Sequence, residues 1–399
     1  MRWPMSTIDA LKAKERYSLI GGPFGSNLTT RDYVDDGVPV IRGCNLPDDR
    51  AFHDDDFVFV NEEKADQLAS NLAFAGDVII TQRGTLGQVG IVPQGCKYKR
   101  YVLSQSQMKL KVDEAVADSR YLYYFFRQPE TVQYIRNFDS SSGVPHINLG
   151  VLKAMRIPLP PLASQQRIVE TVSAYDDLID NNRRRIKLLE DSVRLLFDEW
   201  FVRMRFPRPT ETDVAEGLPE GWARSTLGAV AVNQSRRRVP LSSFEREVRP
   251  GPYPYHGAAG VLDFLDEYIF EGRYLLVGED GTVQTPAGTP MLQLVEGKFW
   301  VSNHAHVLQG GILSTEFLYC LLSAYPIAGH VTGVAQPKLT QGNLNRIPVL
   351  VPPTDLRSAF QQIADPILEQ TFVLRAQIEK LRAARDLLLP RLMSGELPV

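Results

Sequence analysis

The sequence GVPHINLGVLKAMRIP at residues 143–158 returns in altered form as GVAQPKLTQGNLNRIP at residues 333–348. The second copy begins 190 residues after the first, and Arg-Ile-Pro occupies the same place in both copies. A period of this length is too long for one unit of a solenoid and fits a duplicated domain. The chain is therefore expected to contain two similar halves.

Further matches between the halves lie upstream of this pair. GDVIITQRG from Gly76 matches GRYLLVGED from Gly272, and both read as a buried strand that ends in a turn. YVLSQSQMKL from Tyr101 matches WVSNHAHVL from Trp300, a pairing that places Gln105 and Gln107 opposite His304 and His306. Aromatic helical stretches follow at 121–126 and 317–322. The halves are predicted to share one fold while the residues on their turns differ.

A long helix is predicted after each half. Proline-rich exits, IPLPPL from Ile157 and IPVLVPP from Ile347, terminate the preceding structure. The residues that follow place apolar side chains in alternating steps of four and three, the period of a coiled-coil seam. The first seam consists of Ile168, Val172, Tyr175, Ile179, Asn182, Ile186, Leu189, Val193, Leu196 and Trp200. The second consists of Phe360, Ala364, Ile367, Thr371, Leu374, Ile378, Leu381, Arg385, Leu388 and Leu392.

A few residues depart from the seam pattern. Asn182 either fixes the register of a helix pair or faces solvent or a partner, whereas Thr371 and Arg385 interrupt the second seam. Pro366 either disturbs the second helix near its start or, with Asp365 as N-cap, marks the point where regular helix begins. Two such helices in one chain can bury both stripes by pairing with each other.

These patterns predict an α+β fold with two similar mixed α/β domains and two long antiparallel coiled-coil helices. The predicted segments are a first domain at 1–162, a first helical region at 163–205, a second domain at 206–353 and a second helical region at 354–399.

Composition limits the function. The 399 residues are 44% hydrophobic and 23% charged, an ordinary globular mixture. We find no secretory signal and no apolar run long enough to cross a membrane, so a soluble, cytoplasmic protein without a membrane partner is expected. Cys44, Cys96 and Cys320 lack the paired spacing of a zinc site or disulfide framework and are expected to be packing residues.

The net charge of -3 is unusual for a protein that grips DNA alone. Either DNA is not the partner, or another subunit neutralises many of the phosphates. Basic clusters do occur, although such runs more often form solvated faces than binding sites. They lie at Lys97, Lys99 and Arg100, at 183–185, at Arg203 and Arg205, and at 236–238.

Catalytic motifs are missing. The sequence has no GxxxxGK[ST] phosphate loop, no Asn-Pro-Pro-Tyr or Asp-Pro-Pro-Tyr methylation motif and no GxSxG nucleophile elbow. Glu296 and Lys298, with Asp280 upstream, resemble part of a nuclease motif, and a fused nuclease stays open as an alternative. His304 and His306 would face one side of a strand and could bind a metal, read DNA by hydrogen bonding as Gln105 and Gln107 could, or pack beside a core.

The chain resembles the specificity subunits of type I restriction-modification enzymes over nearly its whole length. The matching segments, which are specific in combination, are GPFGSNLTTRDYVDDGVPVIRG from Gly22, LPEGWARSTLG from Leu218, YPYHGAAGVLDFLDEYIF from Tyr253, VGEDG from Val277, FWVSNHAHV from Phe299 and LLLPRLMSGEL from Leu387. The chain departs from the family at its start, where the usual Leu-Pro-x-Gly-Trp entry of a half is absent.

The resemblance implies two target-recognition domains, each reading one half of a split, asymmetric site in double-stranded DNA. It implies that the helical regions dock two methyltransferase subunits and that restriction subunits, which translocate DNA, join them. The chain itself is then non-catalytic and without cofactors, and S-adenosylmethionine, ATP and magnesium belong to the partners. The assembled enzyme would surround the DNA, and its other subunits would neutralise many of the phosphates. The resemblance thus accounts for the negative net charge of this chain. A coiled-coil scaffold with protein-binding ends is the remaining alternative.

Base readers need side chains on turns and strand ends that present two hydrogen bonds, such as arginine to guanine and glutamine or asparagine to adenine. The same residues could equally contact phosphate or sugar. In the first half the candidates are Asn27, Arg42, Gln82, Arg83, Ser104, Gln105, Ser142 and His146. In the second half they are His256, Glu279, Asp280, Asn303, His304, Gln336 and Lys338. Gly84 and Gly281 are expected to serve turn geometry.

Overall fold

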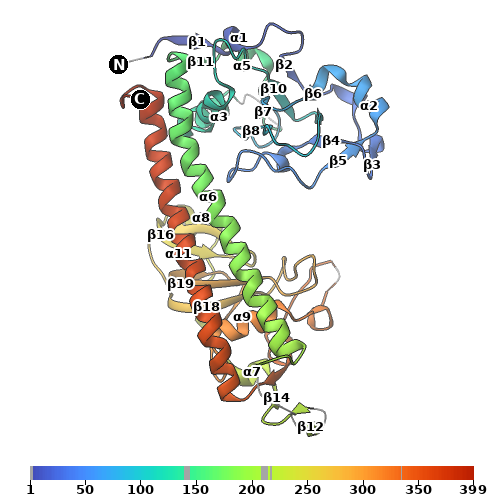
Figure 1. Ribbon diagram of the computed structural model, residues 1–399, viewed down its shortest axis with the longest axis vertical. Coiled ribbons are helices and arrows are strands. Elements are labelled where there is room, and N and C mark those ends of the chain that lie inside the picture. Colours follow the sequence, from blue (N-terminus) through green and yellow to red (C-terminus); the bar gives the residue numbers. More distant parts are fainter. Residues whose placement is uncertain (1–2, 139–143, 208–213, 216–217, 334) are drawn as a thin grey trace. The chain divides into compact units, whose positions relative to one another are not determined.

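The computed structural model describes residues 3–138, 144–207, 214–215, 218–333 and 335–399, and the chain divides into two compact units (Figure 1). Unit 1 contains Met1–Asn182 and Gln377–Val399, and unit 2 contains Arg183–Ala376. Each unit includes part of both long helices, α6 (Leu162–Phe197) and α11 (Thr354–Met393).

Unit 1 is built from small sheets covered by helices. Its four-stranded sheet has the order β2 (Leu19–Gly21), β10 (Gln107–Leu110), β7 (Val78–Thr81) and β8 (Val89–Ile91). Its five-stranded sheet has the order β3 (Tyr33–Val34), β5 (Val58–Val60), β4 (Val38–Ile41), β9 (Tyr101–Leu103) and β6 (Leu72–Ala73). The remaining elements are β1 (Met5–Thr7), which pairs with β11 (Arg156–Pro158), and the helices α1 (Ile8–Leu11), α2 (Glu62–Gln67), α3 (Ser119–Arg127), α4 (Pro129–Arg136) and α5 (Leu149–Ala154).

The core of unit 1 lies between the four-stranded sheet and α3. Every residue of β7 is buried, because one face of the sheet packs on α3 and the other on the five-stranded sheet. Helix α3 begins at its N-cap Asp118, whose carboxylate accepts hydrogen bonds from the backbone of residues 120 and 121. The aromatic stretch 121–126 is buried throughout. Unit 1 therefore has a sheet that is buried on both faces and whose strand ends can present loops.

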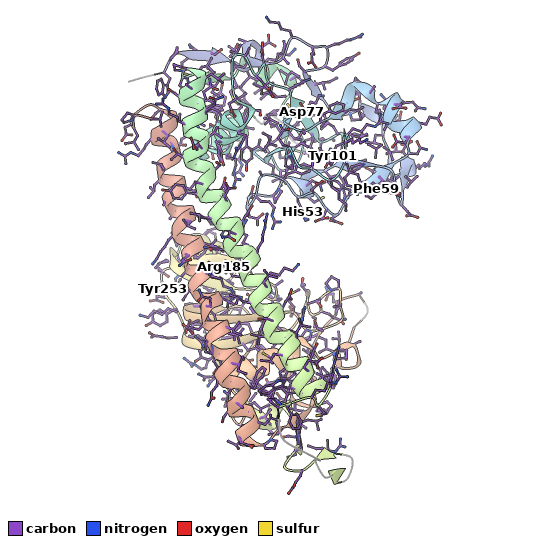
Figure 2. All side chains as sticks on the ribbon, viewed as in Figure 1. His53, Phe59, Asp77, Tyr101, Arg185 and Tyr253 are labelled. Carbon is purple, nitrogen blue, oxygen red and sulfur yellow. The ribbon has the colours of Figure 1, made fainter. Side chains whose placement is uncertain are left out.

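An ion pair is buried in this core. Asp77, labelled in Figure 2, belongs to this pair. Lys109 Nζ lies 3.5 Å from the Asp77 carboxylate, and the two side chains are 7% and 2% exposed. Burial raises the pKa of Asp77, although the attraction of Lys109 opposes this shift. The Lys109 ammonium also donates to the carbonyl of Leu72. Removing either side chain would leave the other buried without this ion-pair partner.

We expect Asp77→Ala to destabilise the chain by about 3–5 kcal/mol, because it leaves the Lys109 charge buried without a counter-ion. The exposed pair between Lys111 and Glu15, at 2.7 Å, is the matched control, and Glu15→Ala should cost less than about 1 kcal/mol. Urea unfolding followed by circular dichroism measures both. Equal effects of the two substitutions would contradict the assignment of Asp77 to a buried, paired site.

Unit 2 repeats this plan on a larger sheet. Its six-stranded sheet has the order β15 (Ala231–Asn233), β20 (Ala305–Gly310), β18 (Phe270–Gly278), β19 (Leu292–Val301), β16 (Pro250–His256) and β17 (Val261–Leu265). The other elements are β12 (Val214–Ala215), which pairs with β13 (Leu218–Pro219), β14 (Ala223–Thr226), which pairs with β21 (Pro348–Val351), and the helices α7 (Leu227–Val230), α8 (Ser243–Glu247), α9 (Thr315–Ser323) and α10 (Gln341–Asn345).

The two units share one strand order, which confirms the duplicated mixed domain. The order β2-β10-β7-β8 in unit 1 corresponds to β15-β20-β18-β19 in unit 2. A parallel pair recurs as β4 with β9 and as β16 with β19, and an antiparallel pair as β1 with β11 and as β14 with β21. Helices α3 and α9 occupy the same place after the sheet.

Helices α6 and α11 pair antiparallel within each unit (Figure 1, green and red). In unit 1, Asp176 contacts Arg385 and Asn182 contacts Gln377. In unit 2, Arg375 donates to Glu190 at 2.5 Å, and the rings of Phe197 and Phe360 lie 5.8 Å apart. Rising numbers on one helix thus meet falling numbers on the other. All predicted seam residues are buried or half-buried.

The polar seam residues are bonded. Arg385 Nη1 donates to Asp176 at 2.5 Å, and the same carboxylate accepts from Tyr124 Oη at 2.7 Å. Thr371 Oγ1 donates to the carbonyl of Leu368 within its own helix at 2.7 Å. The Asn182 side chain donates to Gln377 Oε1 at 3.4 Å, an arrangement that favours a register role.

The prediction that regular helix begins at Asp365 and Pro366 is wrong. Helix α11 begins at Thr354 and continues through both residues without a break. The first turns are held by apolar packing, because Leu356, Phe360 and Ala364 are buried in the core of unit 2. Tertiary burial here outweighs the loss of one backbone donor at Pro366.

Two further predictions concern the cysteines and the membrane. Cys320 is buried and Cys96 half-buried, but Cys44 is exposed, so the assignment of Cys44 as a packing residue is wrong.

Among the described residues, no helix has both the length and the apolar character needed to cross a membrane.

Candidate nucleic-acid interface

Five segments of unit 1 meet beside the end of β7. One of them, residues 42–43, follows Ile41, whose carbonyl accepts a hydrogen bond from Ser104 NH at 3.0 Å. The backbone NH of Gln82 donates to Ser106 O at 2.8 Å, and that of Gly84 donates to Pro145 O at 2.9 Å. Arg83 and His146 form an isolated antiparallel bridge. Gly22 NH donates to Gln107 O at 2.7 Å, which brings in the loop after β2. We name residues 22–28, 42–43, 82–84, 104–106 and 144–146 loop cluster 1.

Unit 2 assembles the same loops beside the end of β18. Glu279 NH donates to His304 O at 2.8 Å, and Ser302 NH donates to His256 O at 2.9 Å. Asp280 and Lys338 form the isolated bridge that corresponds to Arg83 with His146. We name residues 234–238, 256–257, 279–281, 302–304 and 335–338 loop cluster 2.

The two clusters contain every described residue that the sequence predicted as a base reader. Ser142 lies outside the described residues. Gly84 and Gly281 have φ of +94° and +72°, and a Cβ at either position would meet no atom within 4 Å. Their left-handed backbone supports the predicted role in turn geometry.

The structure shifts the alignment of the halves by one residue. Val78 and Ile80 face the core beside α3, and their counterparts beside α9 are Leu275 and Val277. The paired hydrogen bonds from Gln82 to Ser106 and from Glu279 to His304 then match Ser106 with His304, and Gln105 with Asn303. The predicted match of Gln105 and Gln107 with His304 and His306 is therefore wrong. Because side chains alternate along a strand, a slip of one residue exchanges the two faces.

In loop cluster 1 the amides of Gln82 and Gln105 hold the loops, whereas the side chain of Arg83 bonds no other described residue. Gln105 Nε2 donates to the carbonyls of Gly25 at 2.6 Å and Leu28 at 2.7 Å, and Gln82 Nε2 donates to Gln105 O at 2.8 Å. Asn27 and Arg83 are exposed, and neither side chain bonds another described residue. These two side chains can present their hydrogen-bonding groups outward, as base or phosphate contacts require.

The other predicted residues of this cluster are partly engaged. Arg42 is half-buried, and its Nη2 donates to Asp56 O at 2.9 Å. The Ser104 hydroxyl contacts the amide of Gln107, and its backbone NH donates to Ile41 O at 3.0 Å. His146 is exposed beside Arg83. Gln82, Ser104 and Gln105 thus act as positioning groups for the loops in this structure.

Loop cluster 2 is a network of charges. Glu279 accepts from Arg238 Nη1 at 2.7 Å and lies 3.7 Å from Lys338 Nζ. Asp280 contacts His304 Nδ1 and lies 3.9 Å from Lys338 Nζ. Both predicted acceptors are thus held by cations of their own unit. The exposed side chains of Asn303 and Gln336 have no bonded partner among the described residues and are open to a ligand.

The three histidines of this region lie in different environments. His256 is buried, its Nδ1 is 2.9 Å from Gln293 Oε1, and burial lowers its pKa, so a structural role is favoured over base reading. His306 is buried in β20, where burial lowers its pKa and Nε2 is 2.7 Å from Leu339 O. The side chain of His304, just before β20, is 51% exposed. The sequence predicted that His304 and His306 face the same side of a strand. This prediction is wrong, because His304 is exposed before β20 and His306 is buried within it.

The arrangement does not support the metal or nuclease interpretations. Within the described ranges, no group of three histidine, cysteine or acidic side chains is placed to hold a metal ion. Glu296 lies opposite Arg273 in the sheet and bonds it at 2.7 Å, and Lys298 lies opposite Glu271. Asp280 follows the far end of β18, on the order of 20 Å along the strand from Arg273. These acids and the lysine do not form one site.

Sequence reasoning missed Arg238. Basic runs such as 236–238 more often form solvated faces than binding sites, but the Arg238 side chain is only 15% exposed. It donates to the carbonyls of Ser235 at 2.8 Å and Ala305 at 2.6 Å as well as to Glu279. Arg238 therefore fixes the loop at 302–304 from the side of β15. No local signal separated it from its neighbours, because Glu279 and Ala305 are distant in the sequence.

Comparison with known proteins gives a consistent match. The family model described as the type I restriction modification DNA specificity domain matches twice, at residues 30–191 and 219–382. The type I restriction enzyme MjaIX specificity subunit of Methanocaldococcus jannaschii is 26% identical over 415 residues, covering 98% of this chain and 94% of that protein. The EcoprrI specificity subunit of Escherichia coli is 22% identical, covering 72% and 70%.

A solved structure has the same fold. The crystal structure of the type I restriction-modification S subunit from M. genitalium superposes with a TM-score of 0.55 at 18% identity, covering 98% of this chain and 96% of that one.

Proposed function

This chain belongs to the family of type I restriction-modification DNA specificity subunits, and from that premise we propose that it reads a bipartite, asymmetric site in double-stranded DNA. Each unit reads one half of the site through its own loop cluster. The observation that carries the proposal is the recurrence of one loop arrangement with different side chains. The bridge of Arg83 with His146 in unit 1 becomes Asp280 with Lys338 in unit 2.

The second part of the proposal is that α6 and α11 carry the partner subunits. Their outer faces expose large apolar side chains that a soluble helix pair does not need: Leu188 is 68% exposed, Leu195 60% and Leu387 75%. Leu188 and Leu195 are one heptad apart on α6 and thus lie on one face. We assign these faces to two methyltransferase subunits, which restriction subunits join.

The chain itself is proposed to be non-catalytic. S-adenosylmethionine, ATP and magnesium are assigned to the partner subunits. The net charge of -3 fits this division, because phosphate neutralisation can then be shared with the partners.

The test is sequence-dependent DNA binding by the chain in complex with its methyltransferase partner. Methylome sequencing first identifies the site, and fluorescence anisotropy at fixed salt then compares that duplex with one whose half-sites are scrambled. We expect binding at least a thousandfold tighter to the site. Equal binding to both duplexes would favour a scaffold and overturn the proposal.

We also expect the purified chain alone to neither methylate nor cut DNA. It lacks the sequence motifs of base methylation, and Asp280, Glu296 and Lys298 lie apart and are paired elsewhere. Plasmid incubated with the chain and magnesium, and with S-adenosylmethionine in a parallel sample, provides the measurement. Cleavage in the absence of partners that disappears on Glu296→Gln would contradict this expectation.

A further inference from the structure

The loop after β2 carries the most exposed large apolar side chain among the described residues. Phe24 is 90% exposed, compared with 75% for Leu387 and 71% for Phe244. Single exposed apolar residues are common on proteins and need no function. Phe24 differs because its loop is fixed and because it belongs to loop cluster 1.

The loop is held at both ends. A Cβ on Gly22 would lie 1.8 Å from Ser104 O, so the chain passes against the loop after β9 at a distance that only glycine allows. Beyond the tip, the Gln105 amide holds the carbonyls of Gly25 and Leu28, and Asn27 NH donates to Phe24 O at 3.2 Å. The phenyl ring therefore lies on a turn that hydrogen bonds and close packing hold at both ends.

Nothing in the described chain covers the ring. It forms part of the lining of an open hollow of about 620 Å³, with Gln82, Asn148 and Gly150 among the other lining residues. The neighbouring amide of Gln105 is already engaged by the loop itself. The tip thus offers a ligand an apolar surface.

The corresponding loop of unit 2 has a different chemistry. After β15 the chain continues Gln-Ser-Arg-Arg-Arg at 234–238, and its exposed residues Arg236 and Arg237 are cationic. A basic tip suits phosphate, whereas an apolar ring suits the face of a base. The two units are therefore expected to engage their half-sites differently at this position.

We propose that Phe24 inserts against the bases of the half-site read by unit 1 and partly unstacks one base step. Apolar wedges of this kind are used by DNA-binding proteins to open a step, and base-aromatic stacking is sequence-tolerant because every base has a π-face. The half-site must then contain a base step that deforms easily, in addition to the groups that hydrogen-bond with Asn27 and Arg83. The inference rests on the proposed function.

The test uses the chain with its methyltransferase partner and the duplex identified by methylome sequencing. 2-Aminopurine, whose fluorescence rises on unstacking, replaces each adenine of either half-site in turn. We expect one position in the unit 1 half-site to brighten with the wild type and not with Phe24→Ala. Affinity for the site should fall about five- to a hundredfold in that variant, the range that loss of one base-aromatic stack produces.

Controls separate the possible outcomes. Phe264 of β17 is 51% exposed, outside loop cluster 2, and Phe264→Ala should leave both affinity and fluorescence unchanged. Phe24→Trp should keep the brightening, whereas Phe24→Leu should reduce it. Wild-type affinity retained by Phe24→Ala would overturn the insertion. A contact between Phe24 and a thymine methyl group would also overturn the insertion. Its sign is that replacing thymine by uracil weakens binding of the wild type but not of Phe24→Ala. If the wild type itself fails to discriminate the site, the proposed function fails instead.

Discussion

Exchanging residues 21–158 for the same region of a relative with another target is expected to replace one half of the methylated sequence and leave the other half intact. The exchanged region holds the whole of loop cluster 1, and loop cluster 2 lies entirely within 234–338. The reader of each half-site is therefore expected to be transferable.

Contacts between the exchanged region and α6 bear on whether such a chimera folds. Tyr124, inside the exchanged region, donates to Asp176 of α6, which also binds Arg385 of α11. Without a hydroxyl at position 124, the Asp176 carboxylate loses a buried partner. The donor region should therefore supply a tyrosine there, or Tyr124 should be retained.

Methylome sequencing of cells that carry the chimera with its methyltransferase partner gives the readout. The reciprocal exchange of residues 233–348 is the matched control and should change only the opposite half of the site. A chimera that altered both half-sequences, or neither, would contradict modular reading by the two units.

Periodic features of the fold were predictable from the sequence. The duplicated domain and both helix seams follow from spacing alone, since a seam residue such as Ile168 or Phe360 is buried wherever the helix pair forms. The positions of the base-reader candidates were also predictable as a group, because turns that follow buried strands gather at the strand ends.

Features that depend on tertiary partners were not predictable. Arg238 lies in a run of three arginines, and only the folded backbone shows that it alone reaches Glu279. The one-residue shift between Gln105 and His304 had the same origin, since sequence identity cannot distinguish the two faces of a short strand. Asp365 and Pro366 have the local sequence preference of a helix start. The helix begins earlier nevertheless, because Phe360 is buried in the core of unit 2.

The antiparallel pairing also decides where the helices can be lengthened. Insertions after Leu189 and after Leu381 keep the seven-residue period of each seam. These two residues are not opposite each other, however, because Asn182 faces Gln377 and Glu190 faces Arg375. Heptads added there would slide the intervening residues past each other and separate Asn182 from Gln377. Insertions after Asn182 and after Ala376 lie at one level and keep both contacts.

Adding one matched heptad at each of these two points is expected to widen the unspecified gap in the methylated site while both half-sequences stay the same. Seven residues lengthen a helix by about 10 Å, which corresponds to roughly three base pairs at 3.4 Å each. Each loop cluster keeps its own surface, because both insertions fall at the boundary of the units. Rotation about the duplex should weaken binding, so the matched variant needs comparison with one that carries a heptad in α6 alone, whose seam is out of register. Methylome sequencing with the methyltransferase partner reads the gap directly. An active matched variant with an unchanged gap, or with altered half-sequences, would show that α6 and α11 do not set the spacing.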